Sequence, residues 1–261
     1  MKFRPLVAAI LFLASAAAPG ATPTNAERAA QFKRLPNWSG LWVTSFWQVG
    51  VNGRPVGGEK ELRQNLQLLK APPYNPEWNA RYQAGLQDQA MMDARFATLK
   101  ACTRSFPSLM ESPWQFQIAT LPEETLLVFE NGQVRHVYTD GRAHPSGDDI
   151  WPTPLGDSIG HWEGATLVID TVARLSSEPL TVRAWVSLLS DQAHFTERVR
   201  LVDANTLEDR LRIDDPVSLV HPWDLTLRFT RLTDMNRMIP MNCDENDRNP
   251  VVDGKIIITP P

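Results

Sequence analysis

The feature that most constrains the fold is the alternation in residues 194–213, HFTERVRLVDANTLEDRLRI. One set of alternate positions is mostly apolar and the other is mostly charged, as expected for two β-strands that each bury one face. The apolar faces of the two strands coincide only when the connecting loop has an odd number of residues, for example the loop 203–205. Leu201 then faces Leu207 across the predicted hairpin.

Two acidic residues interrupt the apolar face of this predicted hairpin. In the same register Asp209 faces Val199. Glu197 faces Leu211, which makes the two acids diagonal neighbours with α-carbons about 7 to 8 Å apart. A buried carboxylate without a partner costs free energy. Two explanations stay open: a buried arginine or a bridging water pairs with the acids, or the interior is a wet cavity.

A second hairpin is predicted in residues 123–141, EETLLVFENGQVRHVYTDG. The Asn-Gly dipeptide at 131–132 is typical of a two-residue turn between antiparallel strands. With that turn, Leu127 faces His136 across the hairpin. His136 and Tyr138 then lie on the same face as the apolar side chains, and we expect that face to be interior.

The N-terminus has the pattern of a secretory signal peptide, for which we expect residues 1–21. Lys2 and Arg4 precede an apolar run over residues 6–18 that ends in small residues. The run is too short to span a bilayer, and no second run of this kind follows. We therefore expect a protein without an integral membrane segment that is periplasmic or secreted after signal peptide removal.

Residues 22–100 are predicted to form an N-terminal strand and a helical arm. Asn75 before Pro76 has the pattern of an N-cap followed by proline at the first helical position, and apolar residues recur at helical spacing as far as Leu99. Residues 58–70 are a weaker helical candidate. The arm is expected to pack over the β domain.

Residues 101–261 are predicted to form one antiparallel β-barrel domain that is compact together with residues 36–50. Short alternating runs, hairpin turns and a closing apolar strand around Leu227 indicate a mainly β fold. We expect an antiparallel, lipocalin-like barrel or a curved sheet, with the N-terminal helical arm. Gly40-x-Trp42 resembles the first-strand signature of lipocalins, in which the tryptophan plugs the closed end of the barrel.

Composition narrows the classes of partner. The chain has 26 lysines and arginines against 30 acidic residues, a net charge of −4, with both signs interspersed. It has no basic stripe that could follow a phosphate backbone, so we expect no nucleic acid partner. The two cysteines, Cys102 and Cys243, would most simply pair as a disulfide in an oxidising compartment. The alternative is two separate buried thiols.

Two local motifs each have both a functional and a structural interpretation. Residues 156–160, GDSIG, match the pattern of serine hydrolases, but that motif requires a turn between a buried strand and a helix, and here a turn and a strand follow. We therefore do not expect Ser158 to be a nucleophile. His161-x-Glu163 has the spacing of strand metal ligands, and His144 lies in the preceding loop. Because no complete ligand set is present, we expect no metal and no cofactor.

The sequence has more of the residues needed for metal-free acid-base chemistry than of those needed for a metal site. Histidine titrates near neutral pH, and several histidines occur together with carboxylates. The expected catalytic residues are Glu197, His161, Tyr138, Arg142 and Asp170. Glu197 and His161 would be base and acid, Tyr138 and Arg142 would stabilise developing negative charge, and Asp170 would orient Arg142 or His161. The expected substrate-binding residues are His136, His144, Trp151, Trp162, Glu163 and Asp209. A structural interpretation of each residue stays open, for example turns at Asp140-Gly141 and Glu163-Gly164.

Several motifs together resemble a large, mostly uncharacterised family of secreted bacterial proteins. They are TDGRAHP, GDSIGHWEGATLVIDT, HFTERVRLVDANTLEDRLRIDDP and Pro222-Trp223, and they cover residues 102–243. The family has D-G-R-x-H-P, then G-x-W-E-G-x-T-L-V-[VI]-D-T, then a T-E-R strand. The resemblance implies a lipocalin-like β fold exported to the periplasm and no general activity. Ala165 stands where the family usually has aspartate, and Asp209 where it often has an aromatic residue.

These observations lead to one expected function and two alternatives. We expect a periplasmic enzyme that uses cofactor-free acid-base chemistry, of the isomerase, lyase, hydratase or esterase type, on a small apolar or aromatic molecule held in a β-barrel cavity. The first alternative is a non-catalytic carrier or binding protein for a hydrophobic small molecule, which needs only a few satisfied polar groups in the cavity. The second is an envelope protein whose tryptophan-rich face docks a partner.

Overall fold

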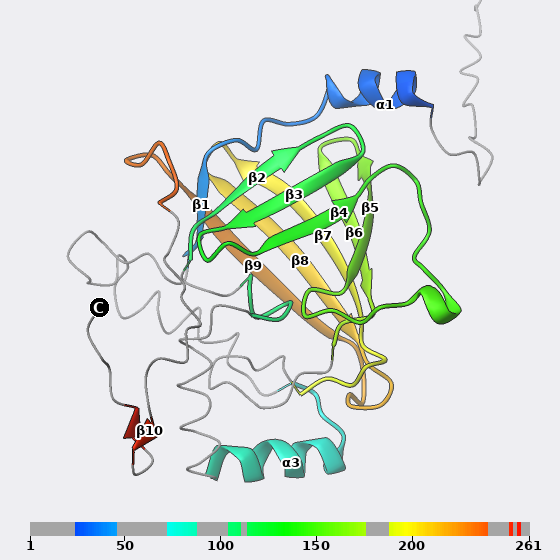
Figure 1. The fold of residues 1–261 in the computed structure, drawn as a ribbon, viewed down its shortest axis with the longest axis vertical. Coiled ribbons are helices and arrows are strands. Elements are labelled where there is room, and N and C mark those ends of the chain that lie inside the picture. Colours follow the sequence, from blue (N-terminus) through cyan, green and yellow to red (C-terminus); the bar gives the residue numbers. More distant parts are fainter. Residues whose placement is uncertain are drawn as a thin grey trace, which may run out of the picture.

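The computed structural model shows a mainly β protein in which nine strands form one sheet that closes on itself (Figure 1). The structure describes residues 24–45, 72–87, 104–110, 114–175, 188–239, 251–252 and 255–256. The expected signal peptide (1–21), the helical candidate at 58–70, Cys102 and Cys243 lie outside the described residues. In the part of the chain that is described, no helix has the length and apolarity needed to cross a membrane.

The nine strands follow one another around the ring in chain order. They are β1 (Leu41–Thr44), β2 (Phe116–Thr120), β3 (Glu124–Phe129), β4 (Val134–Tyr138), β5 (Asp157–Glu163), β6 (Thr166–Val172), β7 (His194–Asp203), β8 (Thr206–Asp214) and β9 (Trp223–Leu232). The ring closes because β1 pairs with both β2 and β9. A separate two-stranded sheet contains β10 (Val251–Val252) and β11 (Lys255–Ile256).

The sheet is mixed, which corrects the prediction of a wholly antiparallel fold. β4 and β5 are parallel, with Tyr138 opposite Ile159, whereas the other neighbouring strands of the ring are antiparallel. Parallel neighbours need a long connection, because the chain must return to the same end of the sheet before the second strand begins. Residues 139–156 supply that connection and contain a short 3-10 helix, η3 (Gly147–Asp149).

Two α-helices are described, and both begin at capping residues. α3 (Pro76–Gln87) begins where the sequence predicted a helix, and the Asn75 side chain accepts a hydrogen bond from the backbone N–H of Trp78 at 3.0 Å. The predicted continuation towards Leu99 lies outside the described residues. α1 (Asn25–Phe32) was not predicted, although the Thr24 capping box that starts it is readable in the sequence.

The register predicted for residues 194–213 is confirmed in β7 and β8. Leu201 pairs with Leu207, and Glu197 pairs with Leu211. The turn is tighter than the example loop, because a register shift after Leu201 brings Asp203 opposite Thr206. Every inward and outward assignment on this hairpin follows from the hydrophobic alternation.

The register predicted for β3 and β4 is wrong by one residue. Leu127 pairs with Arg135 instead of His136, because the loop has three residues, 130–132, and Gly132 takes a positive φ of 85°. The backbone N–H of Phe129 donates to the carbonyl of Gln133 at 2.9 Å and closes this loop. A shift of one residue moves every side chain of β4 to the opposite face. Arg135 therefore points inward, and His136 points outward.

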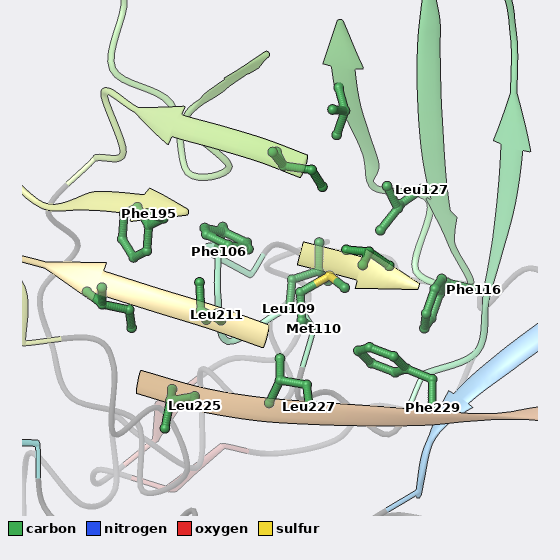
Figure 2. Close-up of a cluster of buried hydrophobic side chains, with 14 of the residues drawn as sticks. Phe106, Leu109, Met110, Phe116, Leu127, Phe195, Leu211, Leu225, Leu227 and Phe229 are labelled. Carbon is green, nitrogen blue, oxygen red and sulfur yellow. The ribbon is translucent and has the colours of Figure 1, made fainter. Parts of the chain in front are cut away.

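The interior of the closed sheet is filled by side chains (Figure 2). Phe106, Leu109 and Met110, from a segment between α3 and β2, are at most 3% exposed and lie among the inward side chains of the strands. A cavity of about 10 Å³ remains between Trp38, Phe229 and their neighbours. A space of this size holds no more than one water molecule.

Candidate functional site

The polar groups of the predicted site lie on two sides of the sheet. The first group is inside, where the side chains of Arg135 and Glu197 are 1% and 0% exposed. The two terminal nitrogens of Arg135 donate to the two oxygens of Glu197 at 2.9 and 2.5 Å. Arg135 also donates to the hydroxyl of Thr171 at 3.0 Å and lies over the ring of Phe106 at 3.9 Å. This is a bidentate ion pair in an apolar core.

Asp209 is the least satisfied group in this interior cluster. It is 0% exposed, and neither carboxylate oxygen accepts a hydrogen bond from any residue that the structure describes. Burial raises the pKa of Asp209 well above its ordinary value, and the nearby Glu197 carboxylate raises it further, against the opposing effect of Arg135. Two ionised carboxylates cannot bond to each other, whereas a protonated Asp209 can donate to Glu197. The pair is therefore expected to hold one proton.

The buried arginine decides between the two explanations for the interior acids. Glu197 is paired with Arg135, and the adjacent cavity is about 10 Å³. Pocket volumes that accept small organic ligands are several hundred Å³. Around these acids, the residues that the structure describes form a packed core with a polar cluster.

The residues that match the G-x-S-x-G pattern, 156–160, have a structural role in this core. Ser158 lies within β5, is 2% exposed, and bonds to the hydroxyl of Thr171 at 2.8 Å. The first and last residues of the motif, Gly156 and Gly160, are glycines for steric reasons. A β-carbon on Gly160 would lie 2.8 Å from the carbonyl oxygen of Val168, and one on Gly156 would lie 2.7 Å from that of Val172. The motif fits close strand packing and lacks the exposed serine of a nucleophile elbow.

Replacing Gly156 with alanine is expected to lower the free energy of unfolding by about 1 to 3 kcal/mol, because an alanine there has a strained φ and contacts backbone. The φ of Gly156 is 73°, and a β-carbon would also meet the side chain of Thr171 at 2.8 Å. Gly147 is the control, since its φ is 60° and a β-carbon would meet nothing within 4 Å. Urea unfolding should show a larger loss for G156A than for G147A. Equal losses would mean that crowding at Gly156 is unimportant.

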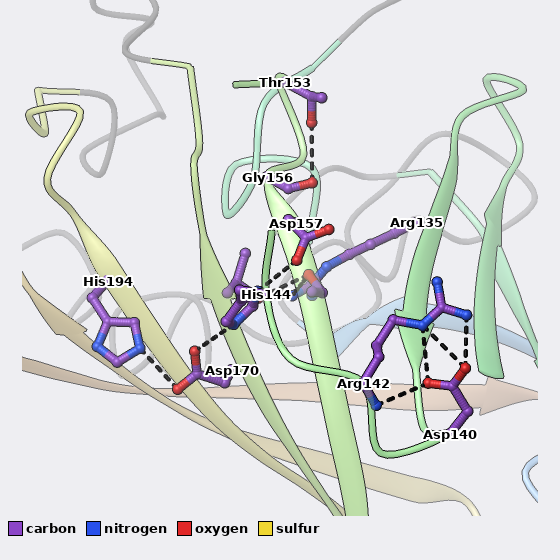
Figure 3. A network of polar contacts seen from close by, with 11 residues as sticks. Arg135, Asp140, Arg142, His144, Thr153, Gly156, Asp157, Asp170 and His194 are labelled. Carbon is purple, nitrogen blue, oxygen red and sulfur yellow. Dashed lines mark hydrogen bonds and ion pairs between the residues drawn. The ribbon is translucent and has the colours of Figure 1, made fainter. Parts of the chain in front are cut away.

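The second group of polar residues lies on the outer face of the sheet (Figure 3). Asp170, on β6, bridges two histidines: one oxygen contacts Nε2 of His144 at 2.8 Å, and the other contacts Nε2 of His194 at 2.8 Å. Nδ1 of His144 contacts Asp157 at 2.5 Å. We call Asp157, His144, Asp170 and His194 the outer relay. Its side chains are between 19% and 43% exposed.

Local structure explains how the outer relay is assembled. Asp170 occupies an outward position between Ile169 and Thr171, which are buried. His194 begins β7, next to β6, and its neighbour Phe195 points inward. His144 belongs to the connection 139–156, which the parallel arrangement of β4 and β5 requires. Alternation and the long connection therefore bring together residues from four segments: β5, which begins at Asp157, β6, β7 and the connection 139–156.

The hydrogen bonds of the relay define roles for its rings. Both nitrogens of His144 face carboxylate oxygens, so both bonds are complete only when each nitrogen bears a proton. His194 presents Nε2 to Asp170, which leaves Nδ1 without a partner among the described residues. A ring held by a carboxylate through one nitrogen, with the other accessible, is the arrangement of a histidine general base.

The structure separates the predicted catalytic residues. Glu197 and Asp209 point into the core, whereas His161 is 66% exposed on the outer face, where its Nε2 contacts Glu163 at 3.2 Å. Glu163 in turn pairs with Arg198 at 2.6 Å. The sheet thus lies between Glu197 and His161. They cannot act as base and acid on one molecule in this conformation.

Tyr138, Arg142 and His136 also lie outside the sheet, which corrects the interior position predicted for Tyr138 and His136. His136 contacts Glu124 at 2.8 Å and stacks on Tyr138, with ring centroids 6.0 Å apart. Arg142 lies 4.0 Å above the ring of Tyr138 and pairs with Asp140 at 2.7 Å. The predicted contact between Arg142 and Asp170 is replaced by these bonds.

The two tryptophans predicted to bind substrate have different environments. Trp151 is 79% exposed, in the same connection as His144. Trp162 packs on Trp38 inside the sheet, with ring centroids 4.9 Å apart. Only Trp151 is therefore accessible to a ligand at the outer face.

Two important partners were missed by the sequence analysis. Arg135 is the buried cation, and a three-residue loop in the first hairpin would have placed it inside. Asp157 completes the outer relay, but it lies in the stretch dismissed as a serine motif, and no local pattern connects it with His144. In the described residues, no three or more histidine, cysteine or acidic side chains form a group suited to a metal ion.

Comparisons with protein-family models, with curated proteins and with solved structures found no match to this chain.

Proposed function

We propose that the protein is an exported enzyme that performs cofactor-free acid-base chemistry on a small apolar or aromatic molecule, with His194 as the group that transfers the proton. The observation that supports this most is the Asp170 carboxylate bridging His144 and His194 at 2.8 Å each. Export is inferred from the signal-like start of the sequence. The proposed site lies on the outer face of β6 and β7.

In this proposal each member of the outer relay has a separate role. Asp170 accepts from Nε2 of His194, which keeps the lone pair on Nδ1, on the side open to substrate. His144, held by Asp157, restrains the Asp170 carboxylate and so the His194 ring. His194 takes a proton from the substrate or from water and returns it later. Isomerisation, elimination, hydration and ester cleavage by an activated water all fit this role.

The apolar part of the substrate is assigned to the connection 139–156. Trp151, in this connection, is 79% exposed, and a large exposed aromatic ring is a natural contact for an aromatic or apolar body. The same connection supplies His144 to the relay. Binding and proton transfer would therefore depend on one segment.

A lipocalin-like barrel is the finer fold that we infer. Trp42 on β1 is 0% exposed, its ring nitrogen donates to the carbonyl of Trp38 at 2.9 Å, and the guanidinium of Arg231 lies 4.3 Å from its ring. A buried first-strand tryptophan supports the inference, and the parallel pair of β4 and β5 is a departure from an all-antiparallel barrel. The carrier alternative is less well supported, because the cavity that the described residues leave beside Glu197 is about 10 Å³.

Replacing His194 with glutamine is expected to reduce turnover about a hundredfold or more, the usual contribution of a positioned general base. The assay incubates the protein with a panel of small aromatic esters, enones and hydroxy acids in D₂O, and mass spectrometry records products and deuterium uptake. Exchange of a carbon-bound proton reports acid-base action even when no net product forms.

H136Q is the matched control for this experiment. His136 is also exposed on the outer face and also contacts a carboxylate, Glu124, at 2.8 Å. Its loss should leave turnover unchanged. Equal activity of H194Q and wild type, or equal losses in H194Q and H136Q, would remove His194 from the mechanism.

A further inference from the structure

A second polar cluster lies on the outer face of β7, β8 and β9, apart from the relay. Arg200, Arg210 and Arg228 surround the carboxylate of Glu208. Arg200 and Arg210 each donate to one oxygen at 3.0 Å, and Arg228 donates to the other at 3.0 and 3.3 Å. Glu208 is 4% exposed, whereas the arginines are 45% to 61% exposed. We call these four residues the arginine cluster.

The register of the sheet explains why these side chains meet. Glu208 on β8 pairs with Arg200 on β7 and with Arg228 on β9, so the acid has an arginine on each side. Arg210 follows two residues along β8 and therefore points to the same face. Glu208 is buried because three long side chains cover it. The guanidinium groups are thus held at fixed positions around one acceptor.

The arginine cluster has an excess of positive charge. Burial of Glu208 by itself raises the pKa of that carboxyl, but hydrogen bonds from Arg228, Arg200 and Arg210 outweigh burial and lower the pKa to about 2. Glu208 is therefore ionised near neutral pH, and three arginines against one carboxylate leave a net charge of two positive units. The chain as a whole has a net charge of −4.

The cluster also has hydrogen-bond donors to spare. Arg210 uses only Nε, and Arg200 uses only one terminal nitrogen, among contacts with the described residues. Arg198 pairs directly with Arg210 across β7 and β8, and like charges in that position are unfavourable. Arg198 has its own carboxylate, Glu163. The unused donors of Arg210 therefore lie in a positive region and face solvent.

We propose that the arginine cluster is a binding site for a phosphate monoester group. Such a group has close to two negative charges near neutral pH, which matches the net charge of the cluster. Its three terminal oxygens can each accept from a planar guanidinium, and arginine recognises phosphate through paired donors. Glu208 serves as the template that spaces the three side chains. This site is independent of the proton transfer proposed for His194.

The test measures binding of inorganic phosphate to the full chain by isothermal titration calorimetry at pH 7.5 and low ionic strength. R210Q is expected to weaken phosphate binding about tenfold, as expected for the loss of a charge-assisted hydrogen bond worth about 1.4 kcal/mol. R212Q is the matched control. Arg212 is on the same strand and face and is 49% exposed, but Asp214 and Asp224 already pair with it at 3.1 and 3.3 Å. R212Q should change the affinity less than about twofold, as for a neutralised exposed pair.

Two further measurements complete the experiment. One distinguishes a specific phosphate site from nonspecific attraction of anions, and the other distinguishes it from the proposed catalytic site at His194. Acetate, with one charge and two oxygens, should bind at least about tenfold more weakly than phosphate. H194Q should bind phosphate as the wild type does. The proposal is overturned if R210Q and R212Q weaken binding equally, if acetate competes as well as phosphate, or if the wild type releases no binding heat. Circular dichroism of both arginine variants confirms that each is folded.

Discussion

Replacing Arg135 with methionine is expected to lower the free energy of unfolding by about 3 to 5 kcal/mol, the usual cost of removing one partner of a buried ion pair. Methionine fills a similar volume but leaves Glu197 in the core without its two hydrogen bonds at 2.9 and 2.5 Å. Thr171 also loses its donor at 3.0 Å. Since domains are stable by only about 5 to 15 kcal/mol, this single change removes a large part of the total.

The matched control for this substitution is R198M. Arg198 also forms an ion pair, with Glu163 at 2.6 Å, but both side chains are about half exposed, 48% and 49%. Exposed pairs contribute about 0 to 1 kcal/mol, so urea unfolding of R198M should be close to that of the wild type. A similar loss in both variants would contradict the argument that burial makes the Arg135 pair costly to break.

Replacing Asp209 with asparagine is expected to leave the free energy of unfolding nearly unchanged at pH 4 and to raise it progressively above the wild-type value as the pH increases. Burial and the neighbouring Glu197 raise the pKa of Asp209 in the folded protein. The folded state therefore holds a proton that the unfolded chain releases above pH about 4, and rising pH favours unfolding by about 1.4 kcal/mol per unit until the folded pKa is reached. An asparagine amide can donate to Glu197 without any proton to lose.

The measurement is the difference in free energy of unfolding between D209N and the wild type, taken from urea titrations at several values between pH 4 and pH 8. The difference should grow with pH. Asp224 is 69% exposed and supplies the control, since D224N should show no such growth. If the difference in free energy of unfolding between D209N and the wild type does not change with pH, Asp209 is ionised in the folded protein and is stabilised by another route.

Much of the fold could be predicted, because hydrophobic alternation reports which face of a strand is buried. The inward positions of Glu197 and Asp209 and the pairing of Leu201 with Leu207 are confirmed. The first hairpin was harder, because Asn131-Gly132 fits both a two-residue turn and the end of a three-residue loop. Contacts outside the hairpin help to hold the observed loop: the Glu130 N–H donates to the Gln115 carbonyl at 2.9 Å.

The candidate site was less predictable than the fold. Asp170 and His144 are both predicted site residues, and the structure brings them into contact at 2.8 Å. His194 belongs to the mostly charged set of alternate positions in residues 194–213, which agrees with its 43% exposure, but no sequence pattern indicates its bond to Asp170. Contacts between strands depend on the positions of whole segments, and residue types alone do not encode them.

By itself the sequence determined the strand character of the chain and the burial of two acids, because a period of two directs alternate side chains to opposite faces. The tertiary structure decided which cation meets Glu197, since a loop longer by one residue turns Arg135 inward and His136 outward. It also decided that the predicted catalytic residues are divided by the sheet. The physical reason is that register and closure are set by packing between distant segments, whereas alternation is local.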